Sequence, residues 1–352
     1  MTSTIERAQA VIGADDDAAD WQLTPEVHAT RLPAEAALLR RVLEQPELTQ
    51  IVARFRAADA AAVVAQARYK RIGRTGLYAA TFAMLIGSVF LLPLEPWMTE
   101  VRGAASALQV ISLVIAFLAA RLLALTKPFN AWMNKRAEAE IARVELFDQI
   151  ARADETSRTG ELSLLSLKLE YFRRYQLDVQ RRYYRGRGEQ HAASLWRNNR
   201  WLSLSLSITV VSVFLVALVA LQMAAAWGVP VPAQIVAFLG YFPPGHINRI
   251  LLALGVIASA LYGLGVARSL MDLDERNASR YLTTAENLDY VNSNLAEARA
   301  AAAAGDSETV LAFIDRVQGL ISSEHQEWIL LSSLDRAPNP KNINRARRRA
   351  DV

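Results

Sequence analysis

Four stretches of the chain carry no charged side chain, and this pattern determines the expected architecture. They cover residues 75–94, 103–120, 201–248 and 250–267. A helix needs about 20 apolar residues, each rising 1.5 Å, to cross the hydrocarbon core of a bilayer. The third stretch is long enough for one crossing followed by a loop. The pattern therefore predicts transmembrane helices at about 75–94, 104–125, 202–227 and 249–271, and it excludes a soluble globular enzyme.

The remaining sequence is typical of amphipathic helices. Helices are predicted over residues 34–72, over 129–153 and from 162 toward 185, and two more follow the last span, separated at Gly305–Asp306. Apolar side chains of the third helix follow an a/d spacing at Leu162, Leu165, Leu169, Phe172, Val179 and Tyr183. Residues 129–185 are therefore expected to form an antiparallel helical hairpin. No alternating β pattern occurs, so we expect an all-α fold.

The two halves of the chain follow the same order of elements, which indicates a duplication. Each half has an R-x-x-R entry (71–74 and 197–200), two spans and then an amphipathic helix, and SVFL occurs at 88–91 and 212–215. An R-x-L motif with Asn-Ala nine residues after the arginine begins at Arg121 and again at Arg268. These features predict a four-helix transmembrane protein built as a tandem two-span repeat with long cytoplasmic helical hairpins. The expected divisions are a flexible N-terminus (1–33), a first repeat (34–160), a second repeat (161–335) and a basic flexible tail (336–352).

The distribution of basic residues predicts the orientation in the membrane. Residues 127–200 carry 15 Lys and Arg, the first 74 residues carry 10, and the stretch from Arg276 onward carries 10. The loop between the first two spans carries only Arg102, and residues 228–248 carry none. Basic segments stay on the cytoplasmic side. Both termini and residues 127–200 are therefore expected in the cytoplasm.

The third predicted span carries hydroxyl groups on one face. Ser205, Thr209 and Ser212 are spaced i, i+4 and i+7. Such a stripe can line a water-filled pore. Alternatively, each hydroxyl can bond to a neighbouring helix or to the carbonyl one turn back, and for any single residue this second interpretation is favoured. Phe214 and Leu215 lie at mid-membrane depth and are candidates for a hydrophobic gate within the pore lining.

The fourth predicted span has small side chains at strict four-residue spacing, at Gly255, Ser259 and Gly263. This pattern lets the backbone of a neighbouring helix approach closely, so these residues are expected to serve in helix packing.

The central regions of the spans contain no Asp, Glu, Lys or His. Ion-coupled transporters usually keep ionisable groups there, so a coupled transporter is disfavoured.

Five arginines are the candidate ligand-binding residues. Arg173, Arg174, Arg181, Arg182 and Arg185 are interleaved with tyrosines on the third extramembrane helix. Guanidinium groups and aromatic rings suit phosphates and nucleobases. The alternative is a solvated face, or contact with anionic lipid headgroups.

Phosphate-binding, serine-hydrolase and zinc-protease motifs are missing, cysteine is absent and the histidines are scattered, so we expect no enzyme, no metal site and no cofactor.

Two segments carry a family resemblance. The stretch YFRRYQLDVQRRYYRGRGEQHAASLWRNNRW (171–201), the two spans after it and FIDRVQGLISSEHQEW (313–328) resemble the SLATT group of prokaryotic two-span membrane effectors. The match covers roughly residues 160–335 and carries Asp178, Gln180, Tyr183, Tyr184, Glu324, His325 and Trp328. The first half resembles a diverged copy. The resemblance implies an antiphage or self-intoxication effector that perforates the bacterial inner membrane after a nucleotide signal.

These features lead to one favoured hypothesis and one alternative. The favoured hypothesis is a homo-oligomeric ion channel, with a tetramer as the simplest assembly. A nucleotide or short oligonucleotide made by a partner nucleotidyltransferase would open it and depolarise the membrane in an abortive infection. The alternative is a non-conducting membrane scaffold whose cytoplasmic helices bind a protein partner. Conductance in pure liposomes separates the two.

Overall fold

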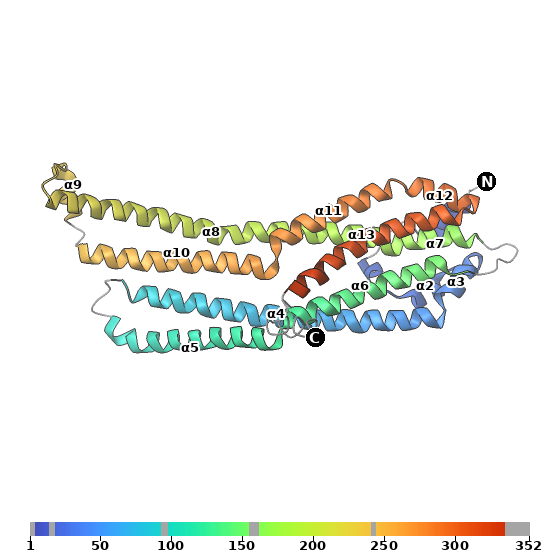
Figure 1. Cartoon of the computed structure of the whole chain (residues 1–352), viewed down its shortest axis with the longest axis horizontal. Helices are drawn as coiled ribbons and strands as arrows, with labels where there is room; N and C mark the ends of the chain where they lie inside the picture. The colour runs from blue at the N-terminus through green and yellow to red at the C-terminus, as the bar shows by residue number, and fades with distance from the viewer. Residues whose placement is uncertain (1–3, 14–17, 93–97, 155–161, 241–243, 335–352) are drawn as a thin grey trace, which may run out of the picture. The chain divides into compact units, whose positions relative to one another are not determined.

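The computed structural model describes residues 4–13, 18–92, 98–154, 162–240 and 244–334 (Figure 1). Helices make up 90% of the structure, and the described residues contain no strand, which confirms the all-α fold. The α-helices are α1 (Thr4–Ile12), α2 (Pro25–Arg31), α3 (Ala37–Leu43), α4 (Pro46–Val89), α5 (Met98–Thr126), α6 (Pro128–Arg152), α7 (Leu164–Phe172), α8 (Val179–Ala226), α9 (Ala233–Leu239), α10 (Pro244–Asp272), α11 (Asp274–Asn292), α12 (Leu295–Ala304) and α13 (Ser307–Leu334). Short 3-10 turns are η1 (Ala18–Trp21) and η2 (Ala34–Ala36), and η3 (Arg173–Asp178) is a π-helix.

The chain divides into two compact units. The membrane unit comprises Arg68–Lys127 and Gln190–Asn277, and the extramembrane unit comprises Met1–Ala67, Pro128–Glu189 and Ala278–Val352. Each unit is therefore assembled from both halves of the sequence, whereas the divisions expected from the repeat follow chain order. The predicted tail, 336–352, lies outside the described residues.

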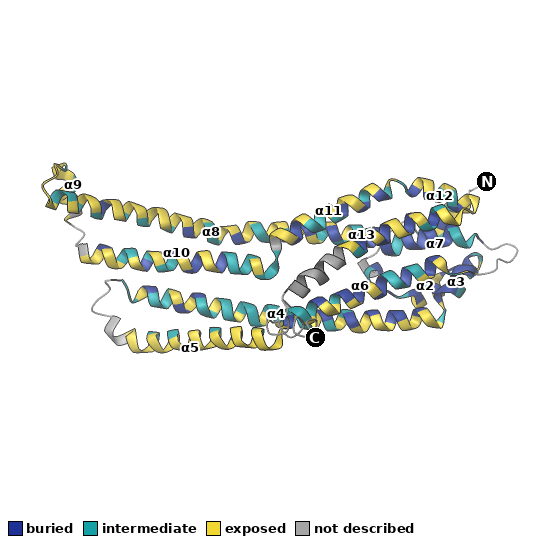
Figure 2. Cartoon of the chain, in the orientation of Figure 1, coloured by how far each residue is buried: buried dark blue, intermediate teal, exposed yellow. Residues whose placement is uncertain are grey.

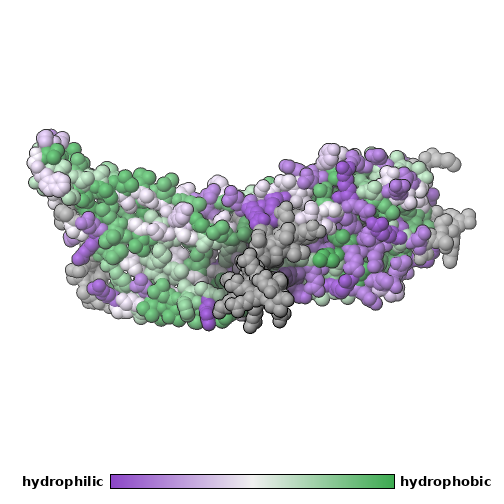
Figure 3. All heavy atoms as spheres, viewed as in Figure 1, coloured by the Kyte–Doolittle hydropathy of each residue, from purple (hydrophilic) through white to green (hydrophobic). Residues whose placement is uncertain are grey.

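The membrane unit contains the apolar parts of α4, α5, α8 and α10. These four helices are long and apolar enough to cross a membrane, which identifies a multi-pass membrane protein and confirms the four predicted spans. Large apolar side chains cover the outside of the unit, as the exposed positions along α5 and α8 in Figure 2 and the hydrophobic surface in Figure 3 show. Phe117, for example, is 68% exposed. In a bilayer such side chains contact lipid or another copy of the chain.

Glycines set the close helix contacts within this unit. A Cβ on Gly76 of α4 would lie 2.8 Å from the Cβ of Ala119 on α5, and a Cβ on Gly265 of α10 would lie 3.1 Å from Leu202 on α8. By contrast, Gly255 and Gly263 have no neighbouring atom within 4 Å of such a Cβ. The close approach predicted at the Gly255, Ser259, Gly263 stripe is therefore not made within the chain, because α10 turns a different face inward. That face carries Ala253, Ala260, Leu261 and Leu264.

The two halves share one structural plan, in agreement with a tandem two-span arrangement. The first span of each half continues a helix that starts outside the membrane unit, because α4 has 44 residues and α8 has 48. The second span of each half lies in a 29-residue helix, α5 or α10. Each of these helices ends before a single non-glycine residue with a positive φ, Lys127 (41°) or Leu273 (52°). Few L-residues adopt this conformation, so it marks a fixed break rather than an extended loop.

Helix α7 is the centre of the extramembrane unit. It packs against α1, α3, α6, α12 and α13, so most of its circumference is covered. Leu167 and Leu169 are fully buried, and so are the polar Ser166 and Glu170. The prediction of a two-helix hairpin that packs through an a/d seam is therefore incomplete, because α7 has more neighbours than α6 alone. Helices α6 and α7 do pack together, but inside a larger bundle that residues 278–321 complete.

The N-terminal residues that the structure describes are packed, so the prediction of a flexible segment over residues 1–33 is wrong there. Helix α1 lies against α7 and α12, and α2 lies against α3. Ala8, Ile12 and Ala29 are buried in the core of the extramembrane unit, and Ile5 packs against that core. Ile5, Ala8 and Ile12 share one helix face, which explains how this short segment docks.

Candidate functional site

The predicted arginines lie on η3 and at the start of α8, and the structure separates them into two groups. Arg173 and Arg174 contact residues 12–13 and 20 near the N-terminus. The Arg173 guanidinium donates to Glu170 (2.8 Å), to Asp178 (2.7 Å) and to the carbonyl of Gly13 (3.0 Å). Arg174 donates from Nε to Asp20 Oδ2 (3.1 Å) and from Nη1 to the carbonyl of Ile12. These two arginines are therefore bound by the protein itself and do not form an open face.

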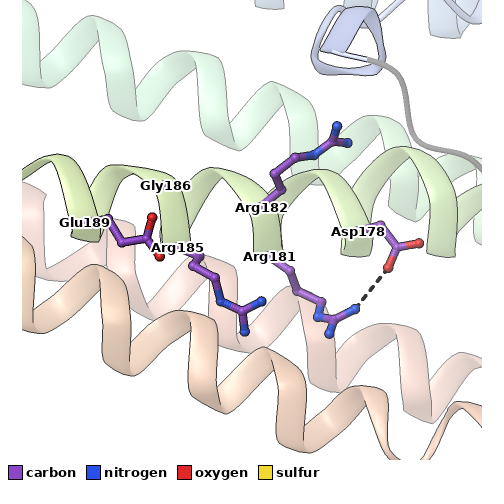
Figure 4. A pocket seen from close by; sticks show the side chains of 6 residues that line it. All are labelled: Asp178, Arg181, Arg182, Arg185, Gly186 and Glu189. Atoms are coloured by element: carbon purple, nitrogen blue, oxygen red, sulfur yellow. Dashed lines mark hydrogen bonds and ion pairs between the residues drawn. The ribbon is translucent and has the colours of Figure 1, made fainter.

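The second group lines an open hollow of about 380 Å³ (Figure 4). Its lining residues are Asp178, Arg181, Arg182, Arg185, Gly186 and Glu189. Arg181 donates to Asp178 (3.2 Å) and from Nε to Asp289 on α11 (2.6 Å), and Arg185 also pairs with Asp289. Figure 4 shows Arg181 and Arg185 pointing to the same side of α8, whereas Arg182 points to the opposite side.

An anion that enters the hollow would compete with the protein's own carboxylates for the arginines. The guanidinium groups of the hollow are partly exposed and are matched by nearby carboxylates, of which Asp289 contacts two arginines at once. An incoming phosphate would have to displace the Asp289 carboxylate from Arg181 and Arg185. Charge-assisted bonds of this kind are strong in a partly buried setting, so only a multiply charged ligand gains enough to compete.

Helix α8 is uninterrupted across Gly186 and Gly188. A Cβ on Gly188 would lie 2.7 Å from Cγ of Leu282, so this glycine permits the close packing of α8 on α11. The two glycines therefore do not break the helix, although their low helix propensity favours a kink. The residues of the hollow and the third span consequently belong to one continuous helix.

A buried polar cluster lies beside η3, and it was not predicted from the sequence. Arg143 is fully buried and donates to the carbonyl of Trp21 (2.7 Å), while Arg136 pairs with the buried Glu140 (2.5 Å). The ring of Trp21 stacks on Tyr183, with ring centroids 4.6 Å apart. These side chains come from η1, α6 and α8, which are distant in sequence, so no local motif marks the cluster. The π-helix beside it is the kind of irregularity that often occurs at functional sites.

His28 belongs to an aromatic group next to this cluster. Its ring stacks on Tyr175 (4.0 Å between centroids), and Nδ1 lies 2.9 Å from the hydroxyl of Tyr171. Burial lowers the pKa of His28 to about 4, and the nearby Asp20 only partly opposes this effect. The neutral imidazole is therefore the form that the folded protein prefers.

His28 is expected to make the extramembrane unit less stable in mild acid. The unfolded state takes up the proton near pH 6.5, whereas the folded state takes it up near pH 4. The full contribution is thus present above pH 6.5 and is lost as the pH falls toward 4, by about 3 kcal/mol in total. Thermal unfolding of the detergent-purified protein at pH 7.5 and 5.0 measures the effect, with His28→Gln as the control. An equal fall of Tm in wild type and His28→Gln would contradict it.

The hydroxyl stripe of the third span is internally hydrogen-bonded. Ser205 donates to the carbonyl of Ala258 on α10 (2.8 Å), Thr209 donates to the carbonyl of Ser205 (3.0 Å), and Ser212 donates to that of Ile208 (2.9 Å). Each oxygen can still accept a bond from water. Phe214 is 60% exposed on the surface of the membrane unit, so a pore lined by this face requires further copies of the chain.

The residues that carry the family resemblance lie partly in this region. Gln180 and Tyr184 are buried and Asp178 binds Arg173, while the side chains of Glu324, His325 and Trp328 lie outside the described residues. No family model matches the chain, and neither a curated protein nor a solved structure is found to match it. Within the described ranges, no group of three or more His, Asp or Glu side chains could hold a metal ion.

Proposed function

We propose that the protein is a SLATT-like membrane effector, a homo-oligomeric ion channel of the bacterial inner membrane that opens on binding a nucleotide or short oligonucleotide. A partner nucleotidyltransferase makes the signal, and the open channel depolarises the membrane in antiphage defence. One observation carries the proposal. Helix α8 runs unbroken from Arg181 and Arg185 to the hydroxyl stripe, so a force applied at the hollow reaches the span without a flexible linker.

Ligand binding acts through the pair of helices α8 and α11. A phosphate that takes Arg181 and Arg185 away from Asp289 removes the ion pairs between the two helices, while the Gly188 contact with Leu282 remains as a pivot. To switch most of the population, the ligand must bind the open state several thousand-fold more tightly, which corresponds to about 5 kcal/mol. A ligand with several phosphates supplies more such contacts than a single phosphate does.

The pore forms between copies of the chain. Four spans per chain are too few to enclose a wide aqueous path, and the exposed apolar face of α8 supplies a surface on which copies can meet. A tetramer is the simplest closed assembly. Phe214 and Leu215 form the constriction, which excludes water in the closed state because it is apolar. Thr209 and Ser212 lie on the same stretch of helix and line the path.

The test uses substitutions at the hollow with opposite expected signs. Asp289→Asn removes the internal competitor and is expected to lower the concentration of nucleotidyltransferase product needed for current about tenfold. Arg181→Gln with Arg185→Gln is expected to abolish the response. Currents are measured in liposomes that contain only the purified protein. No current from wild type with the product of the proposed partner nucleotidyltransferase would refute the channel.

The scaffold alternative keeps one observation in its favour. All three stripe hydroxyls have partners within the chain, so none of them requires a pore. A scaffold gives no current at any ligand concentration, yet it still binds its partner through the extramembrane unit. Liposome currents thus decide between the two functions.

The proposed orientation is tested by cysteine labelling in intact cells. The distribution of basic residues favours a cytoplasmic location for both termini and residues 127–200. Single cysteines at Ser106 and Gly245 are expected to react with an impermeant thiol reagent added outside, and a cysteine at Arg158 is not. The chain has no native cysteine, so every signal comes from the introduced residue. Labelling of Arg158→Cys in intact cells would reverse the orientation.

A further inference from the structure

The side chain of Trp21 is bound in the way that proteins bind a nucleobase. One side of its ring stacks on Tyr183 at an interplanar angle of 21°, and the guanidinium of Arg143 lies 4.4 Å from its centroid. A second guanidinium, that of Arg136, lies 5.6 Å away. A flat ring held by an aromatic side chain and by arginines is a common mode of base recognition.

Next to this ring, the N-terminal segment presents oxygen atoms to arginines. The segment comprises residues 4–13 and 18–32. Asp20 offers a carboxylate to Arg174 at 3.1 Å, with only 7% of the Asp20 side chain exposed. The other acceptors are main-chain carbonyls of Ile12, Gly13 and Trp21, which bind Arg174, Arg173 and Arg143. A carbonyl is neutral, so an anionic phosphate oxygen is a stronger partner for each of these cations.

Buried donors beside the ring have no hydrogen-bond partner among the described residues, although Nε of Arg143 lies 4.0 Å from Oε2 of the buried Glu140. The donors are Nε of Arg143, Nε2 of Gln176 and Nε2 of Gln180, and all three side chains are nearly inaccessible to solvent. Arg143 contacts Gln176 at 3.5 Å, and Gln180 lies one turn further along the same helix. Buried donors are normally paired, because an unpaired one costs free energy. Three of them in one place indicate a layer that can accept further acceptor atoms.

We propose that Trp21 and Asp20 occupy a nucleotide-binding seat formed by Tyr183, Arg136, Arg143 and Arg174. In the resting protein, the Trp21 ring takes the place of a base and the Asp20 carboxylate takes the place of a phosphate. A purine nucleotide with several phosphates displaces them, and the N-terminal segment then leaves the seat. This inference rests on the proposed function, since it names the nucleotide class and the way in which the resting state is held.

The seat is distinct from the open hollow, because side chains two residues apart on a helix do not face each other and Tyr183 lies two residues from both Arg181 and Arg185. A nucleotide in the seat therefore acts through Arg174 and the N-terminal segment. Gly13 permits the resting arrangement, because its φ of +85° is one that L side chains rarely adopt and a Cβ there would meet Nη1 of Arg174.

The experiment measures binding of a fluorescent ATP analogue to the full-length protein in detergent, with unlabelled ATP and inorganic tripolyphosphate as competitors. Trp21→Ala empties the seat and is expected to raise the affinity for ATP at least about tenfold. Asp20→Asn keeps the size of the side chain and is expected to raise it about threefold. Trp196→Ala is the matched control, because that indole is 70% exposed, and it should leave the affinity unchanged.

Two further results complete the test. Arg174→Gln added to Trp21→Ala is expected to return the affinity to the wild-type value. ATP should compete at least about tenfold better than tripolyphosphate, which has the charge but no base. Equal competition would overturn the seat and leave a phosphate site only. A Trp21→Ala protein with wild-type Tm and no gain in affinity would also overturn it, and so would an unchanged affinity of Asp20→Asn if Trp21→Ala does not fold.

These outcomes are independent of those that test the channel. Binding is measured without any current, so a confirmed seat in a protein that never conducts would reject the channel and keep the seat. Conversely, current in response to the nucleotidyltransferase product, with no effect of Trp21→Ala or Asp20→Asn on ATP binding, would keep the channel and reject the seat.

Discussion

Phe172→Asp is expected to unfold the extramembrane unit and, with it, to abolish the proposed oligomer. Phe172 ends the central helix α7, is only 2% exposed and meets the ring of Phe147 edge-on at 6.0 Å between centroids. An aspartate there either carries an unpaired charge in an apolar core or takes up a proton, and both cost free energy. Several kcal/mol are lost together with the ring contacts, which is a large part of the 5–15 kcal/mol that a domain typically has.

The matched control is Ile141→Asp on α6, the helix that also carries Phe147. Ile141 is 58% exposed, so its aspartate remains hydrated and the bundle should keep its stability. Circular dichroism, limited proteolysis and light scattering of the purified proteins measure the difference. A Phe172→Asp protein with wild-type protease resistance and oligomer mass would mean that α7 is not the centre of the core.

Gly76→Leu is expected to separate α4 from α5 and to destroy the membrane unit. A single Cβ at Gly76 already approaches the Cβ of Ala119 to 2.8 Å, and the carbonyl of Ala116 lies at 3.8 Å. A leucine adds three more carbon atoms at this contact, and the opposing backbone has no room to receive them. In a membrane, close packing of this kind is a main source of helix association, because lipid and protein are equally apolar.

Gly255→Leu provides the control for this substitution. Nothing lies within 4 Å of a Cβ at Gly255, so the fold of the single chain should accept the leucine. Expression level, Tm in detergent and the size of the particle measure both variants. Loss of the oligomer in Gly255→Leu with an intact fold would place the small-residue stripe at a contact between copies. Normal Tm in Gly76→Leu would contradict the α4–α5 contact.

The transmembrane helices could be predicted from the sequence because the requirement is local. A charge-free run of sufficient length is enough to predict a span, whatever its neighbours are. The same holds for the helix start at Asp306, whose carboxylate accepts from the backbone N–H groups of Glu308 and Thr309. Such signals act within a few residues along the chain, and periodicity exposes them.

The partners of the arginines could not be predicted, because they are far away in sequence. Arg181 binds Asp289, 108 residues later, and Arg174 binds Asp20, 154 residues earlier. The sequence of a single helix therefore indicates one group of arginines, available either to a ligand or to solvent. In the structure, Asp20 pairs with Arg174 and Asp289 pairs with Arg181, and these two carboxylates come from different elements. The partly buried position of Trp21 has the same cause, because its neighbours Arg136, Arg143 and Tyr183 come from α6 and α8.

The discontinuous extramembrane unit also has a consequence for how the protein is made. Its core joins Leu39 and Phe55 from the first stretch, Phe147 from the second and Val317 from the third. All four spans are synthesised before the third stretch, so they enter the bilayer while this core is still incomplete. Domains of this kind fold only when their last segment arrives. Membrane insertion therefore precedes completion of this core, and a ribosome that stalls before Val317 leaves a chain with four spans and an incomplete extramembrane unit.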